Sequence, residues 1–276
     1  MSSQVLFRKL FLILRYCLLA IVVLITLFPL YYMITTSFKT PIQTYDPSVW
    51  IFKPTMENYI SLFTNYKVTR YIVNSVVVTG VSIALTLVLA SLTAFGFAKY
   101  KFKNKEALAG WILSIRFLPA IAGIIPLFLI GNFLHILDTR FLLILSYLTF
   151  NLPFAIWMLR SYFEEIPQDI EDAAFVDGAN QFQVLTQIIL PLSRPGLFAT
   201  SALLVIQTWN EFGLALFLAT NHSRTMPTLT SQFQTVRGIV WGEMTAMGLL
   251  TTLPVLILAV LARKYLVRGL TLGAVK

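Results

Sequence analysis

Six long apolar segments constrain this chain more than any other feature. A helix needs about 20 mostly apolar residues to cross the hydrocarbon core of a bilayer. Six stretches of the 276-residue sequence meet that requirement, namely Tyr16–Thr36, Ile72–Phe97, Ala109–Ile130, Phe141–Leu159, Leu197–Ala219 and Met247–Tyr265. Only 12% of the residues are charged, whereas soluble domains carry roughly 25%. We therefore predict an all-α polytopic membrane protein with six transmembrane helices.

The lysines and arginines outside the predicted spans set the expected orientation, because cytoplasmic loops carry the excess of these residues. Thirteen of the 21 fall on one side, namely Arg8, Lys9, Arg15, Lys99, Lys101, Lys103, Lys105, Arg160, Arg194, Arg263, Lys264, Arg268 and Lys276. Seven fall on the other side, namely Lys39, Lys53, Lys67, Arg70, Arg140, Arg224 and Arg237. We expect both chain ends to be cytoplasmic. This topology also accounts for the net charge of +9 without a nucleic-acid partner.

The spans divide the chain into five predicted regions. These are a cytoplasmic N-terminus (1–15), a first transmembrane helix (16–36), an external loop (37–71), a five-helix core (72–265) and a cytoplasmic tail (266–276). The first helix lacks a small-x-small cleavage site, so we interpret it as a retained signal-anchor. The core includes a cytoplasmic loop at 164–196 and an external loop at 220–246.

The loop 164–196 is a polar island that holds six of the twelve acidic residues, namely Glu164, Glu165, Asp169, Glu171, Asp172 and Asp177. Pro167 suits the first turn of a helix, because its missing N–H would have no partner there. Gly178 suits a left-handed residue that ends the helix. We predict a short helix between them, followed by a second amphipathic run that stops at Pro191.

The spacing within the short helix is typical of a docking surface. One stripe of the helix consists of Ile170, Ala173, Ala174 and Asp177. The two alanines keep this stripe thin, so that another protein could approach the backbone closely. On charge alone, a solvated acidic loop is the alternative.

The order of these residues carries a family resemblance. Asp172-Ala173-Ala174, Asp177-Gly178-Ala179 and Ile188-Ile189-Leu190-Pro191 together resemble the EAA loop of bacterial ABC import permeases. Five further stretches resemble the carbohydrate branch of these permeases, namely Asn58-Tyr59, Asn74-Ser75, Leu152–Trp157, Trp209–Phe212 and Gly269–Lys276. That branch includes the maltose-type six-span permease. The resemblance covers nearly the whole chain.

The resemblance implies a permease subunit in a bacterial inner membrane that moves a sugar or polyol delivered by an external solute-binding protein. It also implies a second homologous permease subunit and two ATP-binding-cassette subunits. The sequence has no G-x-x-x-x-G-K-[ST] phosphate loop. ATP and Mg²⁺ would therefore be bound by the partner ATPase, and we expect neither enzyme activity nor a cofactor in this chain. The alternatives are an importer of another solute, such as a sugar phosphate or compatible solute, and a non-conducting membrane scaffold.

The resemblance also assigns contacts to particular residues. The expected contacts with the ATPase are Glu171, Asp172, Ala173, Ala174, Asp177 and Gly178. The family's usual glutamate falls on Asp172, with Glu171 just before it, so either carboxylate could make the main ionic contact. The segment 220–246 would reach toward the binding protein, and its candidate contacts are Phe233, Gln234 and Trp241.

Polar residues within the spans are candidates for the translocation pathway, because ionisable groups there usually face a cavity or a partner. They are Arg116, Asn151, Gln207, Trp209, Asn210 and Glu211. Helix–helix hydrogen bonding is the competing interpretation. Arg116 could pair with Glu211, contact solute or reach the cytoplasmic interface, whereas Asn151 could satisfy backbone groups freed by Pro153.

Metal binding is not expected. Cys17 is the single cysteine, which excludes a disulfide framework and a cysteine-ligated metal site. The two histidines, His135 and His222, lie far apart near span ends and are interpreted as interfacial.

Overall fold

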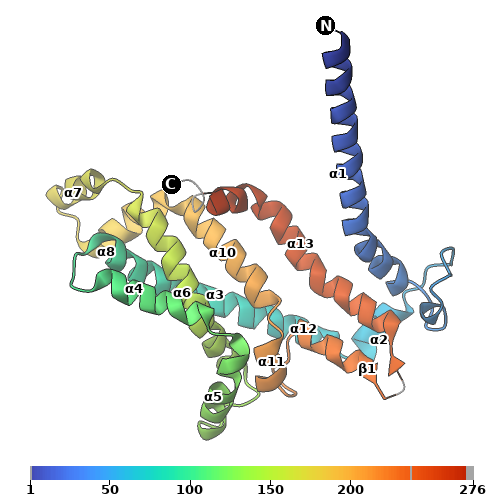
Figure 1. Ribbon diagram of the computed structural model, residues 1–276. Coiled ribbons are helices and arrows are strands. Elements are labelled where there is room, and N and C mark those ends of the chain that lie inside the picture. The colour runs from blue at the N-terminus through green and yellow to red at the C-terminus, as the bar shows by residue number, and fades with distance from the viewer. Residues whose placement is uncertain (1, 237, 272–276) are drawn as a thin grey trace. The chain divides into compact units, whose positions relative to one another are not determined.

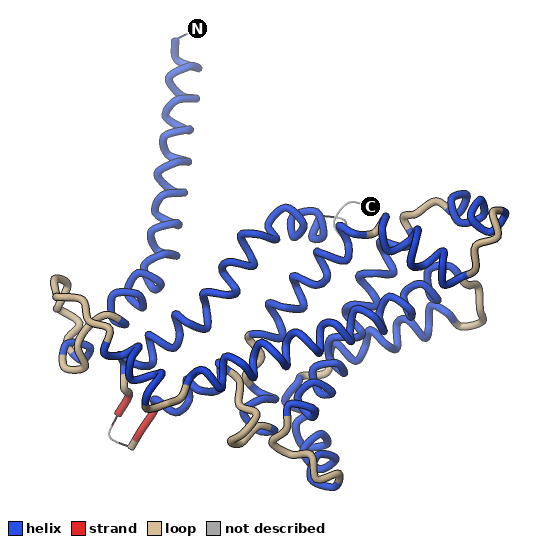
Figure 2. The backbone as a smooth tube through the Cα atoms, turned by 180° about the vertical axis from the view of Figure 1, so that it is seen from behind, coloured by secondary structure: helices blue, strands red, loops and turns tan. Residues whose placement is uncertain are grey.

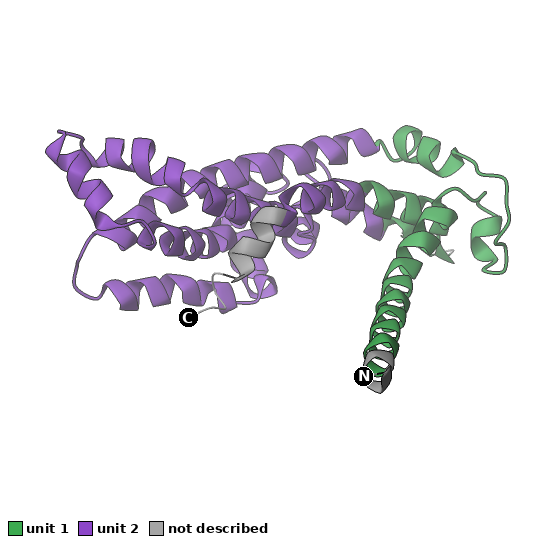
Figure 3. Cartoon of the chain, turned by 90° about the horizontal axis from the view of Figure 1, so that it is seen from above, with its two compact units in different colours: residues 1–67, 232–250 green, residues 68–231, 251–276 purple. Residues whose placement is uncertain are grey.

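The computed structural model describes residues 2–236 and 238–271, with side chains for 7–236 and 238–263. The chain forms two compact units, which Figure 3 shows in green and purple. Unit 1 comprises Met1–Lys67 and Gln232–Leu250, and unit 2 comprises Val68–Ser231 and Thr251–Lys276. The last long helix contributes to both units.

Unit 1 contains one long helix and several short elements, namely α1 (Ser2–Ser37), η1 (Gln43–Tyr45), α2 (Glu57–Thr64), β1 (Gln234–Thr235), β2 (Gly238–Ile239) and the start of α13 (Trp241–Thr271). Buried Asn58 fastens α2 to the end of α1, because its amide donates to the carbonyls of Ser37 and Lys39 at 2.9 and 2.8 Å. The strands β1 and β2 pair antiparallel (red in Figure 2), a hairpin that the sequence analysis does not predict.

Unit 2 contains most of the helices of Figure 1. They are α3 (Val68–Lys99), α4 (Lys105–Ser114), η2 (Ile115–Phe117), α5 (Ala120–Phe133), α6 (Arg140–Glu164), α7 (Gln168–Val176), α8 (Gln181–Gln183), the π-helical η3 (Val184–Ile189), α9 (Leu190–Leu192), α10 (Arg194–Trp209), α11 (Gly213–Leu218), α12 (Met226–Leu229) and η4 (Thr230–Phe233), which ends in unit 1. The pair α3 and α6 makes the most extensive helix contact. Ala90 and Ala94 of α3 and Leu159 and Phe163 of α6 are buried in the same core.

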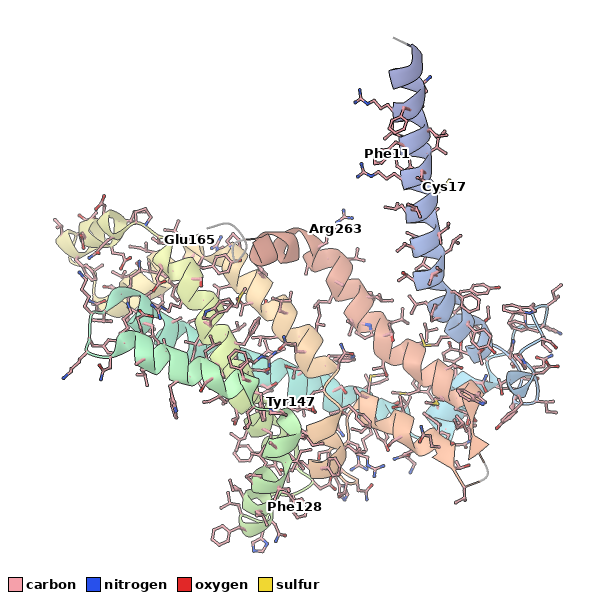
Figure 4. All side chains as sticks on the ribbon, viewed as in Figure 1. Phe11, Cys17, Phe128, Tyr147, Glu165 and Arg263 are labelled. Atoms are coloured by element: carbon pink, nitrogen blue, oxygen red, sulfur yellow. The ribbon has the colours of Figure 1, made fainter. Side chains whose placement is uncertain are left out.

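The lengths of the helices agree with an all-helical polytopic membrane protein. In the described residues, four helices are long and apolar enough to cross a membrane, within Phe7–Ser37, Val68–Lys99, Arg140–Glu164 and Trp241–Arg263. Two bent helix pairs raise the number to six if each pair is one span. Most apolar side chains of the first of these helices are exposed, as is Cys17 (Figure 4), which suits a helix surrounded by lipid.

The third apolar segment is not the single straight span that we predicted for Ala109–Ile130. The segments Lys105–Phe117 and Ala120–Phe133 meet at 92°. Leu118 is extended, with ψ of 123°, and precedes Pro119. A proline pushes the preceding residue out of the helical region and cannot donate an N–H bond. The turn at Pro119 therefore divides the segment.

The fifth segment, predicted as Leu197–Ala219, also differs. Helix α10 ends at Trp209, and Asn210 to Phe212 separate it from α11. At its N-terminal end, α10 meets the helical run Gln181–Leu192 at 77°. Pro195 stands in the first turn of α10, the position where a proline costs no hydrogen bond.

We expect the close contact between α6 and α10 to depend on Gly196, because a Cβ there would overlap the ring of Tyr162. Gly196→Ala should lower the free energy of unfolding by about 1–3 kcal/mol, the usual cost of overpacking. Gly80→Ala is the matched control, since Gly80 has no atom within 4 Å of such a Cβ. Thermal unfolding in detergent micelles compares the two variants, and equal midpoints would contradict the packing argument.

Candidate functional site

The helix α7 forms where the sequence predicts it. Pro167 precedes the helix with ψ of 136°, and Asp169 and Glu171 lie in the first turn, where negative charge complements the helix dipole. Gly178 follows it with φ of +85°. The N–H of Ala179 then donates to the carbonyl of Ala174 at 2.9 Å. The predicted left-handed end of the helix is confirmed.

One face of α7 is buried against the rest of unit 2. Glu171 and Ala174 are 3% and 9% exposed, and Ala174 belongs to the same core as Phe163. The predicted stripe is therefore divided, because Ala174 faces inward while Ile170, Ala173 and Asp177 are exposed.

An ion pair fixes this buried face. The ammonium of Lys99, the last residue of α3, contacts a carboxylate oxygen of Glu171. Lys99 also donates to the carbonyl of Ile166 at 3.2 Å. The two charged side chains are only 13% and 5% exposed, so the pair is largely withdrawn from water. Of the two carboxylates that the sequence leaves open, Glu171 is therefore engaged within the chain, and Asp172 is exposed.

The opposite face of α7, which we call the outer face (Ile170, Asp172, Ala173, Val176 and Asp177), mixes apolar and acidic groups. Val176 is 88% exposed and Ile170 is 42% exposed. Exposed apolar residues that form a contiguous patch with a polar rim are typical of protein interaction sites. The outer face is thus suited to dock a partner with apolar and basic groups.

The segment after α7 packs into the same core as Ala174. Asn180 and Gln183 form a capping box, in which the Asn180 side chain accepts from the Gln183 N–H at 2.9 Å and the Gln183 side chain accepts from the Asn180 N–H at 2.8 Å. In the following π-helix, Val184, Leu185 and Ile189 are buried in the core. The helical run continues through α9 to Leu192, so Pro191 lies inside it and does not stop it as predicted. A proline in the first turn of a helix removes no hydrogen bond that the turn needs.

The polar residues of α6 and α10 mostly serve contacts between helices. The Asn151 amide donates to the Thr208 hydroxyl at 2.9 Å, and both residues are buried. This bond replaces the expected role of Asn151 toward backbone groups near Pro153. Trp209 is 7% exposed, and its indole N–H donates to the Thr251 carbonyl at 3.0 Å. Its ring is thus largely covered.

Glu211 stabilises the start of α11. Its carboxylate accepts the backbone N–H groups of Leu214 and Ala215 at 2.8 and 3.2 Å. The expected pair between Arg116 and Glu211 is therefore absent from the described residues. Arg116 instead donates to the Gln207 side chain at 2.8 Å and lies 5.5 Å from the centre of the Phe154 ring. Asn210 is exposed, and its amide donates to the Ile206 carbonyl at 2.8 Å.

The candidate contacts in 220–246 separate into covered and exposed residues. Phe233 is fully buried and packs on Tyr66, with ring centroids 4.9 Å apart. Because Phe233 is buried, it is unavailable to a partner. Its prediction as a contact with the binding protein was therefore wrong. Gln234 in β1 and Trp241 at the start of α13 are exposed.

Asp138, which no motif in the sequence singles out, ties two loops of unit 2 together. Its carboxylate accepts the N–H groups of Asn221, His222 and Ser223 at 2.7–3.1 Å and the Ser223 hydroxyl at 3.1 Å. Asp138 has φ of +56°, and Thr139 caps α6 directly after it. The only local signal is the Asp-Thr pair before an apolar run, which indicates a helix start and gives no partner 83 residues away.

Comparisons with known proteins agree with this architecture. A family model described as "Binding-protein-dependent transport system inner membrane component" matches residues 83–272. The trehalose/maltose transport system permease protein MalG of Thermococcus litoralis is 35% identical over 280 residues, covering 100% of this chain and 99% of that protein. The sulfoquinovosyl glycerol transport system permease protein SmoH of Agrobacterium fabrum is 33% identical over 266 residues, covering 95% and 93%.

The fold is also found among solved structures. A chain of the crystal structure of a bacterial alginate ABC transporter in complex with alginate pentasaccharide-bound periplasmic protein is similar, with a TM-score of 0.71. The match has 18% sequence identity and covers 94% of this chain and 96% of that one.

Removing the charge of Glu171 should destabilise the protein far more than removing that of Asp172. Glu171→Gln leaves the Lys99 ammonium without its counter-charge, and breaking a buried pair costs about 3–5 kcal/mol. Asp172→Asn alters an exposed group and should change the free energy of unfolding by about 0.5 kcal/mol or less. Denaturant unfolding in micelles compares the two. The double exchange Lys99→Glu with Glu171→Lys should recover part of the loss, and equal effects of the single variants would refute the pair's role.

Acidification should loosen the contact between Asp138 and residues 221–223. Burial alone raises the pKa of the Asp138 carboxyl, but the bonds from His222, Ser223 and Asn221 outweigh it, so the pKa lies below its usual value of 3.8. A lowered pKa means that the contribution is complete above the ordinary pKa and is lost as the pH falls through the folded-state value. Hydrogen-exchange protection of the 221–223 amides should therefore fall below about pH 4. Asp138→Asn should be less protected at neutral pH and show no such acid step.

Proposed function

This chain belongs to the family of binding-protein-dependent transport system inner membrane components, and we propose that the solute it imports is a sugar or polyol. It is a multi-pass inner-membrane permease subunit of an ATP-binding-cassette importer and is not itself the catalytic subunit. The chain's site for coupling to the ATPase is, in our proposal, the outer face of α7. The observation that carries this is a helix that is anchored on one side by Lys99 and Glu171 and exposes Asp172 and Val176 on the other.

The exposed face of α7 is suited to a basic groove. Asp172 and Asp177 offer charge and Val176 offers apolar area, whereas Ala173 adds little bulk between them. Because Glu171 is held by Lys99, Asp172 would make the main ionic contact with the ATPase. The anchored face would then transmit displacement of α7 to α3, which is a rigid-body transition of a kind common in switching proteins.

The partners and the topology follow from the same proposal. One further permease subunit, two ATP-binding-cassette subunits and an external solute-binding protein would complete the importer, with ATP and Mg²⁺ bound by the ATPase. Both chain ends and α7 would face the cytoplasm, supported by the excess of lysine and arginine on that side. Gln234 and Trp241 remain candidates for contact with the binding protein because both are exposed.

The assignment to carbohydrate is supported by the relatives and by the intramembrane polar groups. The proteins at 35% and 33% identity are named for transport of trehalose/maltose and of sulfoquinovosyl glycerol. In this chain, Gln207 binds Arg116, and Asn210 lies three positions further on, where α10 ends. Both residues carry amide groups. Amide groups can donate to and accept from hydroxyls, which suits a polyhydroxylated solute.

A charge on the outer face of α7 should uncouple the importer. Val176→Glu places a carboxylate in a surface that would be covered by the ATPase, and we expect at least a tenfold loss of transport-linked ATP hydrolysis, since burying an unpaired charge is costly. Ile42→Glu is the matched control, because Ile42 is exposed to the same extent, 87% against 88% for Val176, but lies at the start of η1, away from both α7 and the segment 220–246. ATPase activity of the complex in proteoliposomes measures both variants. An undiminished Val176→Glu activity would exclude this docking face.

The solute class is tested on the cognate binding protein and in uptake. Titration of purified binding protein with a panel of sugars and polyols, followed by uptake of the radiolabelled ligand into vesicles containing the complex, should give ATP-dependent accumulation. Accumulation of a non-carbohydrate solute instead, with no sugar bound, would overturn the carbohydrate assignment and leave the family membership intact.

A further inference from the structure

We propose that Arg116 is a recognition point for an anionic group on the transported solute, a deepening of the proposed carbohydrate import that rests on it. The solute would be an acidic sugar, bearing an oxyanion such as a carboxylate, sulfonate or phosphate. The observation behind this is a guanidinium placed at a break in a membrane span and held only by neutral groups in the described residues, Gln207 and Phe154.

Arg116 lies inside its predicted membrane span. It is seven positions beyond Ala109, the first residue of the third predicted span, which corresponds to about 10 Å of helix rise. Its partner Gln207 is ten positions beyond Leu197, the first residue of the fifth predicted span, or about 15 Å. Both spans start on the same predicted side. Both counts therefore place the pair within a hydrocarbon core about 30 Å thick.

The backbone beside Arg116 requires water or protein around it. Leu118 is extended and Pro119 has no N–H, so the helical hydrogen bonds stop here. Irregular backbone at membrane depth is tolerated only where it is buried in protein or lines a water-filled cavity. Phe117 and Leu118 are 81% and 50% exposed in this chain. Within a complete importer, this break would lie against the partner permease along the solute path.

The charge of Arg116 has no counter-charge among the described side chains. The ion pairs found there are Lys99–Glu171, Arg160–Glu106 and Arg160–Glu164. The carboxylate within the fifth predicted span, Glu211, already accepts two backbone N–H groups of α11. A charged side chain is expensive at this depth and usually marks an ion or substrate pathway. Arg116 is thus exposed and is not neutralised by any side chain that the structure describes.

The donors around Arg116 fit an acidic sugar. A guanidinium has five N–H donors in a planar fork that matches a carboxylate or phosphate, and the bond to Gln207 uses one nitrogen. Because the Gln207 oxygen accepts from Arg116, the Gln207 amide nitrogen is left to donate to a hydroxyl. Asn210, one helical turn further on, uses its amide nitrogen on Ile206 and keeps its oxygen as an acceptor. The guanidinium also lies over the ring of Phe154.

Arg116 could instead be neutralised by a carboxylate of the second permease subunit. The electrostatic potential near Arg116 distinguishes this alternative from recognition of an anionic solute. A neutralised Arg116 would attract no anion from water, whereas a free one would. Cys17 is the only cysteine of this chain, so Cys17→Ser with Asn210→Cys gives the chain a single thiol three positions beyond Gln207, the partner of Arg116. Any cysteines of the partner subunits are replaced by serine. The assembled complex in proteoliposomes is then treated with an anionic sulfonatoethyl methanethiosulfonate or a cationic trimethylammonioethyl methanethiosulfonate.

The ratio of the anionic to the cationic reaction rate should fall about tenfold or more in Arg116→Gln, as expected for loss of a nearby unit charge in a partly desolvated site. Arg116→Lys should keep most of the ratio. Arg194→Gln is the control, because it removes the same charge at the far end of α10 and should leave the ratio unchanged. A ratio that Arg116→Gln does not alter, or a thiol that neither reagent reaches, would overturn the proposal.

Protection by solute separates this inference from the proposed function. D-glucuronate should slow modification of the thiol at residue 210, D-glucose at the same concentration should not, and Arg116→Gln should abolish the difference. Equal protection by both sugars would refute recognition of an anion while supporting carbohydrate import. Sugar binding and uptake by the unmodified importer test that import separately.

Discussion

The ion pair between Lys99 and Glu171 is the interaction on which the functional part of the structure depends. Lys99 ends the long helix α3, and Glu171 lies on the buried face of α7. Two charges that are this far withdrawn from water are costly to desolvate, and the ion pair is stable only because each charge compensates the other. The pair gives α7 one fixed orientation. That orientation buries Ala174 and leaves Asp172 and Val176 exposed, so the anchoring of one face determines what the other can bind.

The sequence predicts local features well and distant partners poorly. The left-handed Gly178 and the proline before α7 are determined by backbone sterics of neighbouring residues, so they can be read from the chain alone. Lys99 and Glu171 are 72 positions apart, and the sequence gives no reason why this lysine, among the four between 99 and 105, should turn inward. Phe233 shows the same limit, because an aromatic residue in an external loop can either contact a partner or, as here, pack on Tyr66.

The breaks in the spans show why composition cannot reveal where a helix ends. Pro126 and Pro153 lie inside helices α5 and α6, whereas the chain turns by 92° at Pro119. Prolines are tolerated in transmembrane helices where neighbouring groups satisfy the freed backbone. Whether such neighbours exist depends on tertiary contacts. A window of apolar residues therefore predicts that 109–130 enters the membrane and is insensitive to the turn within it.

The same contacts connect the outer face of α7 to the polar groups within the membrane. The Lys99–Glu171 pair joins α7 to α3, and α3 packs along α6. Buried Asn151 of α6 donates to Thr208 of α10. Gln207, the residue before Thr208, accepts a hydrogen bond from Arg116. Contiguity of packed groups is a physical route for coupling only when one element has two arrangements that both ends bias. The broken spans are suited to be that element, because a helix divided at Pro119 or after Trp209 can tilt on one side of the break without displacing the other. Docking at α7 and the environment of Arg116 would then be linked through helices whose breaks lie at the polar groups themselves.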